Sequence, residues 1–377
     1  MAKRRMEKHD KTGWSLFNRL LGAYVEWTRF PDLPEHPRIG KNYEYFPEGA
    51  VCGCGKPYHG CIRLGTENKL IIGFSGGGVS FSEYTAARPQ RIGNQEQNFY
   101  ADDVWFGDVV PRMGTFGQNK KNPFRDWSLL FVPYASGDFH CGTADYPYTD
   151  LNGQKAVLYH HGYTNYRALL KKIKEFVPNP DQILVTGFSA GAFATSLLTD
   201  DICEAFPQCK NITACVDSAI MCHPDWHQVA KEVWKSPPEI ADRLAGPEIV
   251  TDSLLALHEK RPDVKIMYCC SKRDAALTQF VGFLEENGNW NPTKKTGDMF
   301  QAHLKDMVQR LKSAIPNISI FIFDTPDKNN KDAELTVHCL CGSNAAFQTA
   351  VDGVTCVDWM RRGVGGEVIQ VGLEKLK

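Results

Sequence analysis

The segment 183–198 restricts the fold of this chain more than any other part of the sequence. It reads ILVTGFSAGAFATSLL, in which a β-branched apolar run meets the pentapeptide GFSAG and then takes on a helical pattern. A strand, a tight turn and a helix with a serine at the turn form a nucleophile elbow, and glycines such as Gly187 and Gly191 tolerate its strained backbone. Ser189 is therefore the candidate nucleophile. The alternative is a serine that only caps an ordinary helix.

The same GxSxG pattern occurs a second time, at 73–77, and makes Ser75 a rival nucleophile. Three consecutive glycines follow Ser75, and each costs a helix about 1 kcal/mol relative to alanine, so no helix is expected here. A glycine-rich loop after an early strand is instead typical of an oxyanion hole, because glycine lets backbone N–H groups approach a reacting atom closely. The expected donors are Gly77 or Gly78, together with Ala190. A flexible hairpin or linker is the alternative.

A serine nucleophile needs a general base and an orienting carboxylate, which in α/β hydrolases follow it in the order acid, then histidine. His338 lies in a loop after the last strong apolar run, ISIFIFDTP, and is the expected base. Asp274 follows another apolar run, at the expected position of the acid. Asp217 ends the apolar run before that one and is the weaker alternative. The expected triad is therefore Ser189, Asp274 and His338.

Apolar runs alternate with helical patterns along the chain, which is typical of a parallel sheet covered on both faces. We expect an α/β fold of the α/β-hydrolase type, with a mainly parallel central sheet, flanking helices and insertions at 237–250 and 294–298, above the sheet or between elements. Strands are expected at 69–74, 128–133, 182–186, 212–216, 264–269 and 318–323, and helices at 163–176, 192–205 and 301–314.

The N-terminal part of the chain differs from the rest. Residues 14–25 carry apolar side chains at helical spacing, which predicts an amphipathic helix that docks onto the protein, and a connector rich in proline and glycine follows. We expect an N-terminal helix and connector over 1–60 and one catalytic domain over 61–377. The basic N-terminus has no clear cleavage site, so no secretory signal is expected and the cytoplasm is the default location.

Composition narrows the class of partner. Because 43 Lys and Arg residues face 44 Asp and Glu residues, no global field is expected to recruit nucleic acid or an acidic membrane. No apolar stretch approaches the roughly 20 residues of a transmembrane helix. The 13 cysteines show no paired CxxC spacing, which favours disulfides or buried thiols over a structural zinc site. We expect neither a metal nor an organic cofactor, and nothing here predicts an oligomeric state.

Over roughly 69–342, the motifs together resemble the pectin acetylesterase family. The glycine loop Gly76-Gly77-Gly78 resembles the family's GGGWC segment, GFSAG its GSSAG elbow, and Val216-Asp217-Ser218 its DSG or DAG motif. The stretch that begins at Asp274 resembles the one with the family's catalytic aspartate, and His338-Cys339 resembles its HC motif.

The resemblance implies a serine esterase whose triad is Ser189, Asp274 and His338, and it makes Asp217 a structural or pocket-lining residue. The implied substrate is an O-acetyl ester on a polysaccharide such as pectin; the alternatives are a carboxylesterase or lipase for another short or fatty acyl ester, and an inactive carbohydrate-binding protein. Val79 and Ser80 stand where the family has Trp and Cys, so a substrate-facing aromatic residue and a family disulfide are expected to be missing. The family is mostly secreted, in contrast with the default location above.

Overall fold

A central sheet organises the chain. A computed structural model describes residues 29–90, 97–104, 107 and 109–377. Within these residues the sheet has nine strands, in the order β1-β2-β4-β3-β7-β8-β9-β10-β13. Their bounds are β1 Asn42–Tyr45, β2 Gly60–Arg63, β3 Lys69–Phe74, β4 Ser128–Val132, β7 Gln182–Phe188, β8 Ile212–Asp217, β9 Lys265–Ser271, β10 Ser319–Phe323 and β13 Gln370–Val371.

The sheet is mainly parallel, as the apolar runs predicted. The strands from β4 to β13 in the sheet order pair in parallel, whereas β1 and β2 are antiparallel and form one edge. Side chains alternate between two cores: Leu70, Ile72 and Phe74 lie in one core and Ile71 in the other. Burial of both faces explains why these strands read as continuous apolar runs. The predicted fold class is confirmed.

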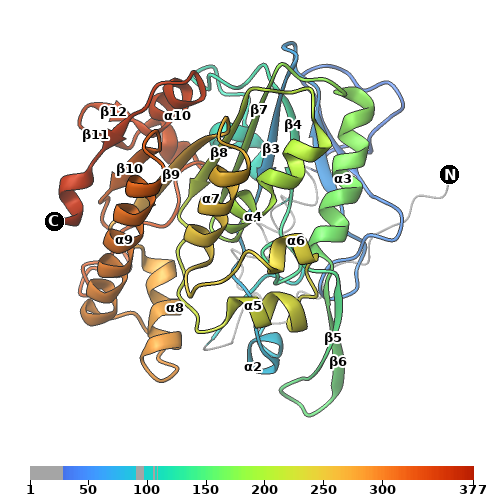
Figure 1. The fold of residues 1–377 in the computed structure, drawn as a ribbon. Helices are drawn as coiled ribbons and strands as arrows, with labels where there is room; N and C mark the ends of the chain where they lie inside the picture. Colours follow the sequence, from blue (N-terminus) through green and yellow to red (C-terminus); the bar gives the residue numbers. More distant parts are fainter. Residues whose placement is uncertain (1–28, 91–96, 105–106, 108) are drawn as a thin grey trace.

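Helices cover both faces of the sheet (Figure 1). Helices α3, α4, α7 and α9 contribute to the first core and α10 to the second. Their bounds are α3 Gly162–Phe176, α4 Ala190–Ala205, α7 Ile249–Lys260, α9 Lys294–Ala314 and α10 Cys356–Val364. The prediction that 294–298 is an insertion is wrong, because Thr293 and Thr296 form a capping box that starts α9 at Lys294.

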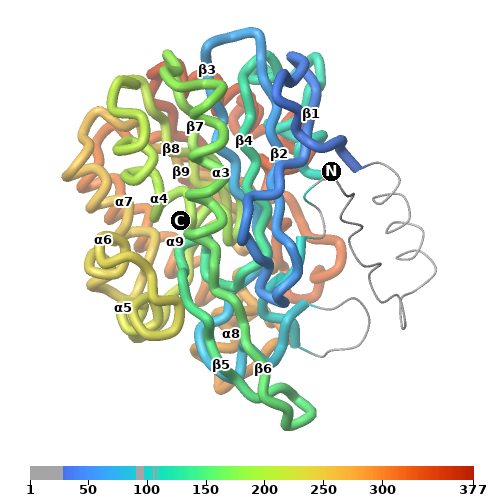
Figure 2. Tube along the Cα trace, turned by 90° about the vertical axis from the view of Figure 1, so that its right-hand side faces the viewer, coloured from blue at the N-terminus to red at the C-terminus, as the bar shows by residue number. Residues whose placement is uncertain are grey.

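Smaller elements gather at the end of the molecule where β3, β7, β8 and β9 finish. Figures 1 and 2 show α8 and the β5–β6 hairpin at this lower end, and Figure 1 adds α2 and α5. The bounds are α2 Glu83–Ala86, β5 Ala144–Thr149, β6 Lys155–His160, α5 Trp226–Gln228, α6 Pro238–Ala241 and α8 Ala275–Glu285, while β11 Ala350–Val351 and β12 Val354–Thr355 form a separate pair. Ligands of α/β sheets bind at the carboxyl ends of strands, so a site is expected here.

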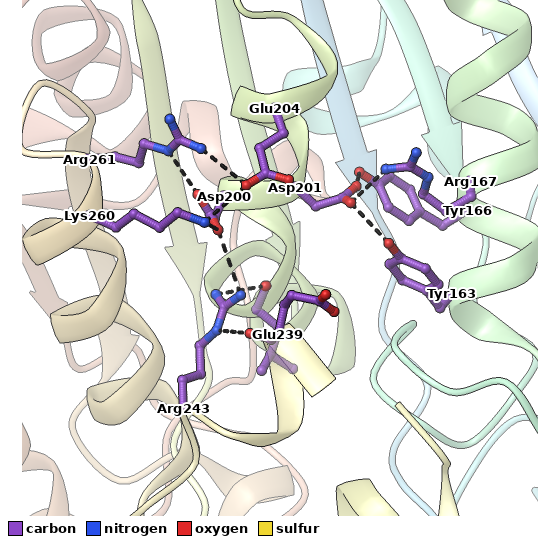
Figure 3. A network of polar contacts seen from close by, with 11 residues as sticks. Tyr163, Tyr166, Arg167, Asp200, Asp201, Glu204, Glu239, Arg243, Lys260 and Arg261 are labelled. Atoms are coloured by element: carbon purple, nitrogen blue, oxygen red, sulfur yellow. Dashed lines mark hydrogen bonds and ion pairs between the residues drawn. The ribbon is translucent and has the colours of Figure 1, made fainter. Parts of the chain in front are cut away.

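Helix α4, which follows the elbow serine, is fixed at its other end by two adjacent carboxylates (Figure 3). Asp200 accepts hydrogen bonds at 2.8 Å from Lys260 and from Arg261, at the end of α7. Asp201 accepts one at 2.7 Å from the Tyr166 hydroxyl of α3. Polar contacts on both sides therefore hold α4 in place between its neighbours.

Three predictions concern the rest of the chain. The N-terminal helix over 14–25 lies outside the described residues, and β1 shows that part of the connector joins the sheet. All thirteen cysteines, each of them in the described part, are free thiols. Within that same part, no helix has the length and apolar character that crossing a membrane requires.

Candidate active site

The two GxSxG motifs lie side by side at the carboxyl edge of the sheet. Strands β3 and β7 pair in parallel, with Gly73 opposite Thr186 and Phe74 opposite Gly187. Each motif therefore leaves its strand next to the other, although more than a hundred residues separate them in the sequence.

Ser189 occupies the turn between β7 and α4, as the sequence predicted. Its backbone has φ 55° and ψ −128°, a left-handed geometry that costs a non-glycine residue about 1–3 kcal/mol. The turn is too tight for a side chain on its flanking glycines. A Cβ on Gly187 would lie 2.2 Å from the Gly191 carbonyl oxygen, and one on Gly191 would lie 2.1 Å from the Phe74 carbonyl oxygen. The local structure is that of a nucleophile elbow.

Asp274 and His338 form a close polar pair at this edge. Nδ1 of His338 lies 2.7 Å from Oδ2 of Asp274, a carboxylate with no solvent exposure. Oδ1 of Asp274 accepts the N–H groups of Ala276 at 3.1 Å and Leu277 at 3.0 Å, so the same side chain caps α8. The carboxylate is therefore fixed on both of its oxygens before it orients the imidazole.

The electrostatics of the pair favour a basic imidazole. Burial is the largest influence on the pKa of His338 and lowers it, but the charge of Asp274 and the hydrogen bond to it raise the pKa above its ordinary value. Because Nδ1 faces a carboxylate, it carries the proton of the neutral ring. Nε2 is buried and has no hydrogen-bond partner among the described residues, so its lone pair is free to accept a proton.

Asp217 connects the histidine loop to the elbow. Its Oδ2 accepts the N–H groups of Leu340 at 2.8 Å and Cys341 at 2.7 Å, while its carbonyl oxygen accepts the Ser189 N–H at 3.0 Å. Burial raises the pKa of Asp217 and the two N–H donors oppose that rise. The side chain is fully buried and is not part of the lining of the pocket described below. Its contacts are those of a residue that holds two loops in register.

The glycine loop after Ser75 faces the elbow. A Cβ on Gly76 would lie 2.5 Å from Cβ and 3.2 Å from Oγ of Ser189, so the loop approaches the serine as closely as a backbone can. In the described part of the chain, the N–H groups of Gly77, Gly78 and Ala190 have no acceptor.

The predicted donors of this loop differ in position. Gly77 lines the pocket with Gly76, which the sequence reasoning did not single out although it is the fourth residue of the motif. Gly78 has φ +75°, is not in the lining, and would place a Cβ 1.9 Å from the Phe99 carbonyl oxygen.

A pocket of about 500 Å³ opens beside the elbow. Its lining is mixed, with apolar, amide and glycine groups from both halves of the chain. It comprises Ser75, Gly76, Gly77, Gln90, Asn98, Ala101, Asp103, Gly107, Val110, Pro133, Tyr134, Phe188, Gln279 and Trp290. Trp290, which the sequence reasoning did not identify, supplies an aromatic wall, whereas Val79 and Ser80 are fully buried. Within the described residues, no cluster of His, Cys, Asp and Glu is arranged to hold a metal ion.

The sheet, the elbow and the order of the polar residues define an α/β hydrolase. The chain belongs to the pectinacetylesterase family, whose model matches residues 44–235, and this membership makes it an esterase. The matched region contains the glycine loop and the elbow, and Asp274 and His338 lie beyond it. The family resemblance inferred from the motifs is confirmed.

Solved structures with a similar fold include two crystal forms of the Wnt deacylase Notum from Drosophila. They are 15% and 14% identical to this chain, each with a TM-score of 0.56 and each covering 87% of it; the match takes in 95% and 94% of the Notum chains. At this identity the likeness concerns the fold. A comparison with curated proteins finds no match.

Proposed function

We propose that the chain is a serine esterase in which Ser189 is the nucleophile, His338 the general base and Asp274 the carboxylate that orients it. The observation that carries the proposal is the Asp274–His338 pair at 2.7 Å, with Nε2 of the imidazole left without a partner. Ser189 Oγ also has no hydrogen-bond partner among the described residues, so the bond between the two is not made here. In unliganded enzymes such bonds commonly tighten only when substrate binds.

The reaction follows from these positions. Nε2 of His338 takes the proton of Ser189 Oγ as that oxygen attacks the acyl carbonyl, and Asp274 stabilises the imidazolium. The N–H groups of Gly77 or Gly78 and of Ala190 bind the oxyanion of the tetrahedral intermediate. The imidazolium then gives its proton to the leaving alcohol, which departs and leaves an acyl-serine. Water, deprotonated by His338, clears the acyl group.

The substrate we propose is an O-acetyl ester on a polysaccharide, the class to which pectin belongs. The family supports a carbohydrate-linked ester, and the pocket presents amide side chains such as Gln90 and Gln279 near the elbow, groups that suit hydroxyls better than an alkyl chain. The fold neighbour described as a Wnt deacylase supports the alternative, a short or fatty acyl ester on another carrier.

Labelling with a fluorophosphonate probe tests the nucleophile. The wild-type protein and Ser75→Ala should label, and Ser189→Ala should not, while keeping the thermal stability of the wild type. Labelling that persists in Ser189→Ala but vanishes in Ser75→Ala would contradict the assignment. A wild-type protein that neither labels nor hydrolyses p-nitrophenyl acetate would favour the inactive carbohydrate-binding protein instead.

A series of p-nitrophenyl esters of increasing acyl length tests the acyl group. We expect kcat/KM to be highest for acetate and to fall as the chain lengthens, since the pocket is lined by polar groups as well as apolar ones. A maximum at eight carbons or more would instead identify a fatty acyl esterase.

A further inference from the structure

A second pocket adjoins the one beside the elbow. It has a volume of about 550 Å³ and is lined by Gln97, Gly288, Asn289, Trp290 and Asn291. Trp290 also lines the first pocket, so the indole forms a wall that the two share. Four of these five residues belong to the segment between α8 and α9.

The lining of the second pocket is uncharged and contains both hydrogen-bond donors and hydrogen-bond acceptors. The carboxamides of Gln97, Asn289 and Asn291 carry NH₂ donors and oxygen acceptors, which is the pairing that sugar hydroxyls require. Two of the oxygens already accept one hydrogen bond each, that of Gln97 from the Tyr84 hydroxyl at 2.7 Å and that of Asn289 from the Asn291 N–H at 3.1 Å, and each keeps a second lone pair. The face of an indole is apolar and matches the C–H face of a sugar ring, while its N–H provides a polar contact. Aromatic and amide groups converging on one cavity are typical of small-molecule recognition.

Trp290 is held rigidly and its N–H is left free. Its ring packs against Phe99 at 4.5 Å and Phe280 at 5.2 Å between centroids. The indole N–H groups of Trp226 and Trp234 donate to backbone carbonyls at 3.0 and 2.7 Å, whereas that of Trp290 has no acceptor among the described residues. A fixed, half-buried indole with an unused donor is prepared to contact a ligand.

The charge of the pocket lining distinguishes between a neutral sugar and an acidic one. Of the described residues that line either pocket, none is Lys, Arg or His. The charged residue that does line one, Asp103, is ion-paired with Lys56 at 2.8 Å. A uronate carboxylate bound here would lose hydration without gaining a cation, which is unfavourable. The described part of the lining therefore suits an uncharged sugar.

We propose that Trp290 forms, with Gln97, Asn289 and Asn291, a subsite for a neutral sugar residue of the polysaccharide substrate. The neighbouring sugar of that polysaccharide presents its acetyl group to Ser189. This inference rests on the proposed function, since it assigns the second pocket to the same substrate. The subsite distinguishes this protein from an enzyme that recognises galacturonate, because it selects a neutral polysaccharide.

A calorimetric measurement of binding to the Ser189→Ala variant tests the subsite, because this variant binds the substrate without turning it over. The probes are an acetylated xylohexaose, which is neutral, and an acetylated hexagalacturonide. We expect the neutral probe to bind at least tenfold more tightly than the anionic one. In the Ser189→Ala background, Trp290→Ala should weaken the binding of the neutral probe about tenfold, and Asn291→Ala should weaken it about threefold. Asn152→Ala, an exposed amide at the hairpin tip, is the matched control and should leave the affinity unchanged.

The two proposals fail in different ways. Equal or tighter binding of the galacturonide, or an unchanged affinity in both subsite variants, would overturn the subsite even if the wild type hydrolyses acetyl esters. Tight binding of the neutral probe that depends on Trp290, in a wild type that releases no acetate, would uphold the subsite and overturn the proposed catalysis.

Discussion

The motifs GFSGG and GFSAG share a pattern and a place in the sheet but differ in what their serines do. Ser75 Oγ accepts a hydrogen bond at 2.8 Å from the N–H of Tyr134, and its carbonyl oxygen contacts Nε2 of His140 at 3.1 Å. Ser189 Oγ has no partner in the described part of the chain. The Oγ of the first serine is held by the fold through this bond, whereas the Oγ of the second is left available for chemistry.

The residues after each serine explain the difference. Ala190 and Gly191 continue into a helix, which turns the Ser189 backbone to φ 55° and presents its side chain. Gly76 and Gly77 instead continue as a loop along the pocket. A GxSxG string therefore indicates a nucleophile elbow only together with the helix that follows it.

The two motifs also depend on each other. A Cβ on Gly191 would meet the carbonyl oxygen of Phe74, and one on Gly76 would meet Ser189. Each turn uses a glycine to accommodate the other. The comparison thus predicts that a side chain added at either of these glycines disturbs the other motif.

The largest effect short of removing Ser189 is expected for Asp274→Asn. The amide can still cap α8, but its NH₂ group would face Nδ1 of His338 and favour the wrong tautomer, so kcat should fall by about 10⁴. The pH profile of kcat/KM is the second measurement. In the wild type the acid limb should lie above pH 6.5, because Asp274 raises the pKa of His338 against the effect of burial, and in the variant it should move to lower pH.

Asp274→Glu is the control for the charge, because it keeps the carboxylate and moves it by one methylene. It should retain a raised acid limb with a smaller loss of kcat. An Asn variant with an unchanged pH profile would show that Asp274 does not set the basicity of His338.

Gly76→Ala tests the contact between the motifs. The added methyl would lie 2.5 Å from Cβ of Ser189 and 2.8 Å from the Phe188 carbonyl oxygen, so the elbow must shift. A displacement of about 1 Å in a reacting group costs about 10²-fold in rate, and kcat/KM for p-nitrophenyl acetate should fall by that order. Gly153→Ala, at a turn where the methyl has open space, is the matched control for alanine at a glycine site, although its φ of +79° carries some strain. Equal activity in both variants would show that the motifs do not touch as described.

Asp217→Ala tests how the elbow and the histidine loop stay in register. The change leaves the buried N–H groups of Leu340 and Cys341 without an acceptor, which costs about 1–3 kcal/mol each in the free energy of unfolding. We expect kcat to fall about tenfold, because His338 loses its position but not its partner. Asp217→Asn can keep one acceptor oxygen and should recover most of both losses in urea unfolding and in kcat. Activity that is lost equally in both variants would instead argue for a direct role of the charge.

Much of this site could be predicted from sequence because its local signals are strong. The parallel strands are buried on both faces, so their apolar runs indicated where they lie. Chain order together with position after an apolar run indicated Asp274 and His338. Residues whose role depends on distant contacts could not be found in this way. Gly76 matters because of its approach to Ser189, and Trp290 because its loop folds back over Phe99. Neither contact leaves a periodic trace in the sequence, and the GxSxG pattern that contains Gly76 does not show which residue it approaches.

The smallest effect on activity is expected for Ser75→Ala, and it separates the two motifs most clearly. The buried N–H of Tyr134 would lose its acceptor, so the free energy of unfolding should fall by about 1–3 kcal/mol in urea titration. kcat/KM should stay within about threefold, since the Ser75 Oγ contacts the Tyr134 N–H and not the Asp274–His338 pair. Ser189→Ala should behave in the opposite way, stable but inactive, because its Oγ contributes no hydrogen bond to the fold. If Ser75→Ala were as stable as the wild type and as inactive as Ser189→Ala, the roles of the two serines would have to be exchanged.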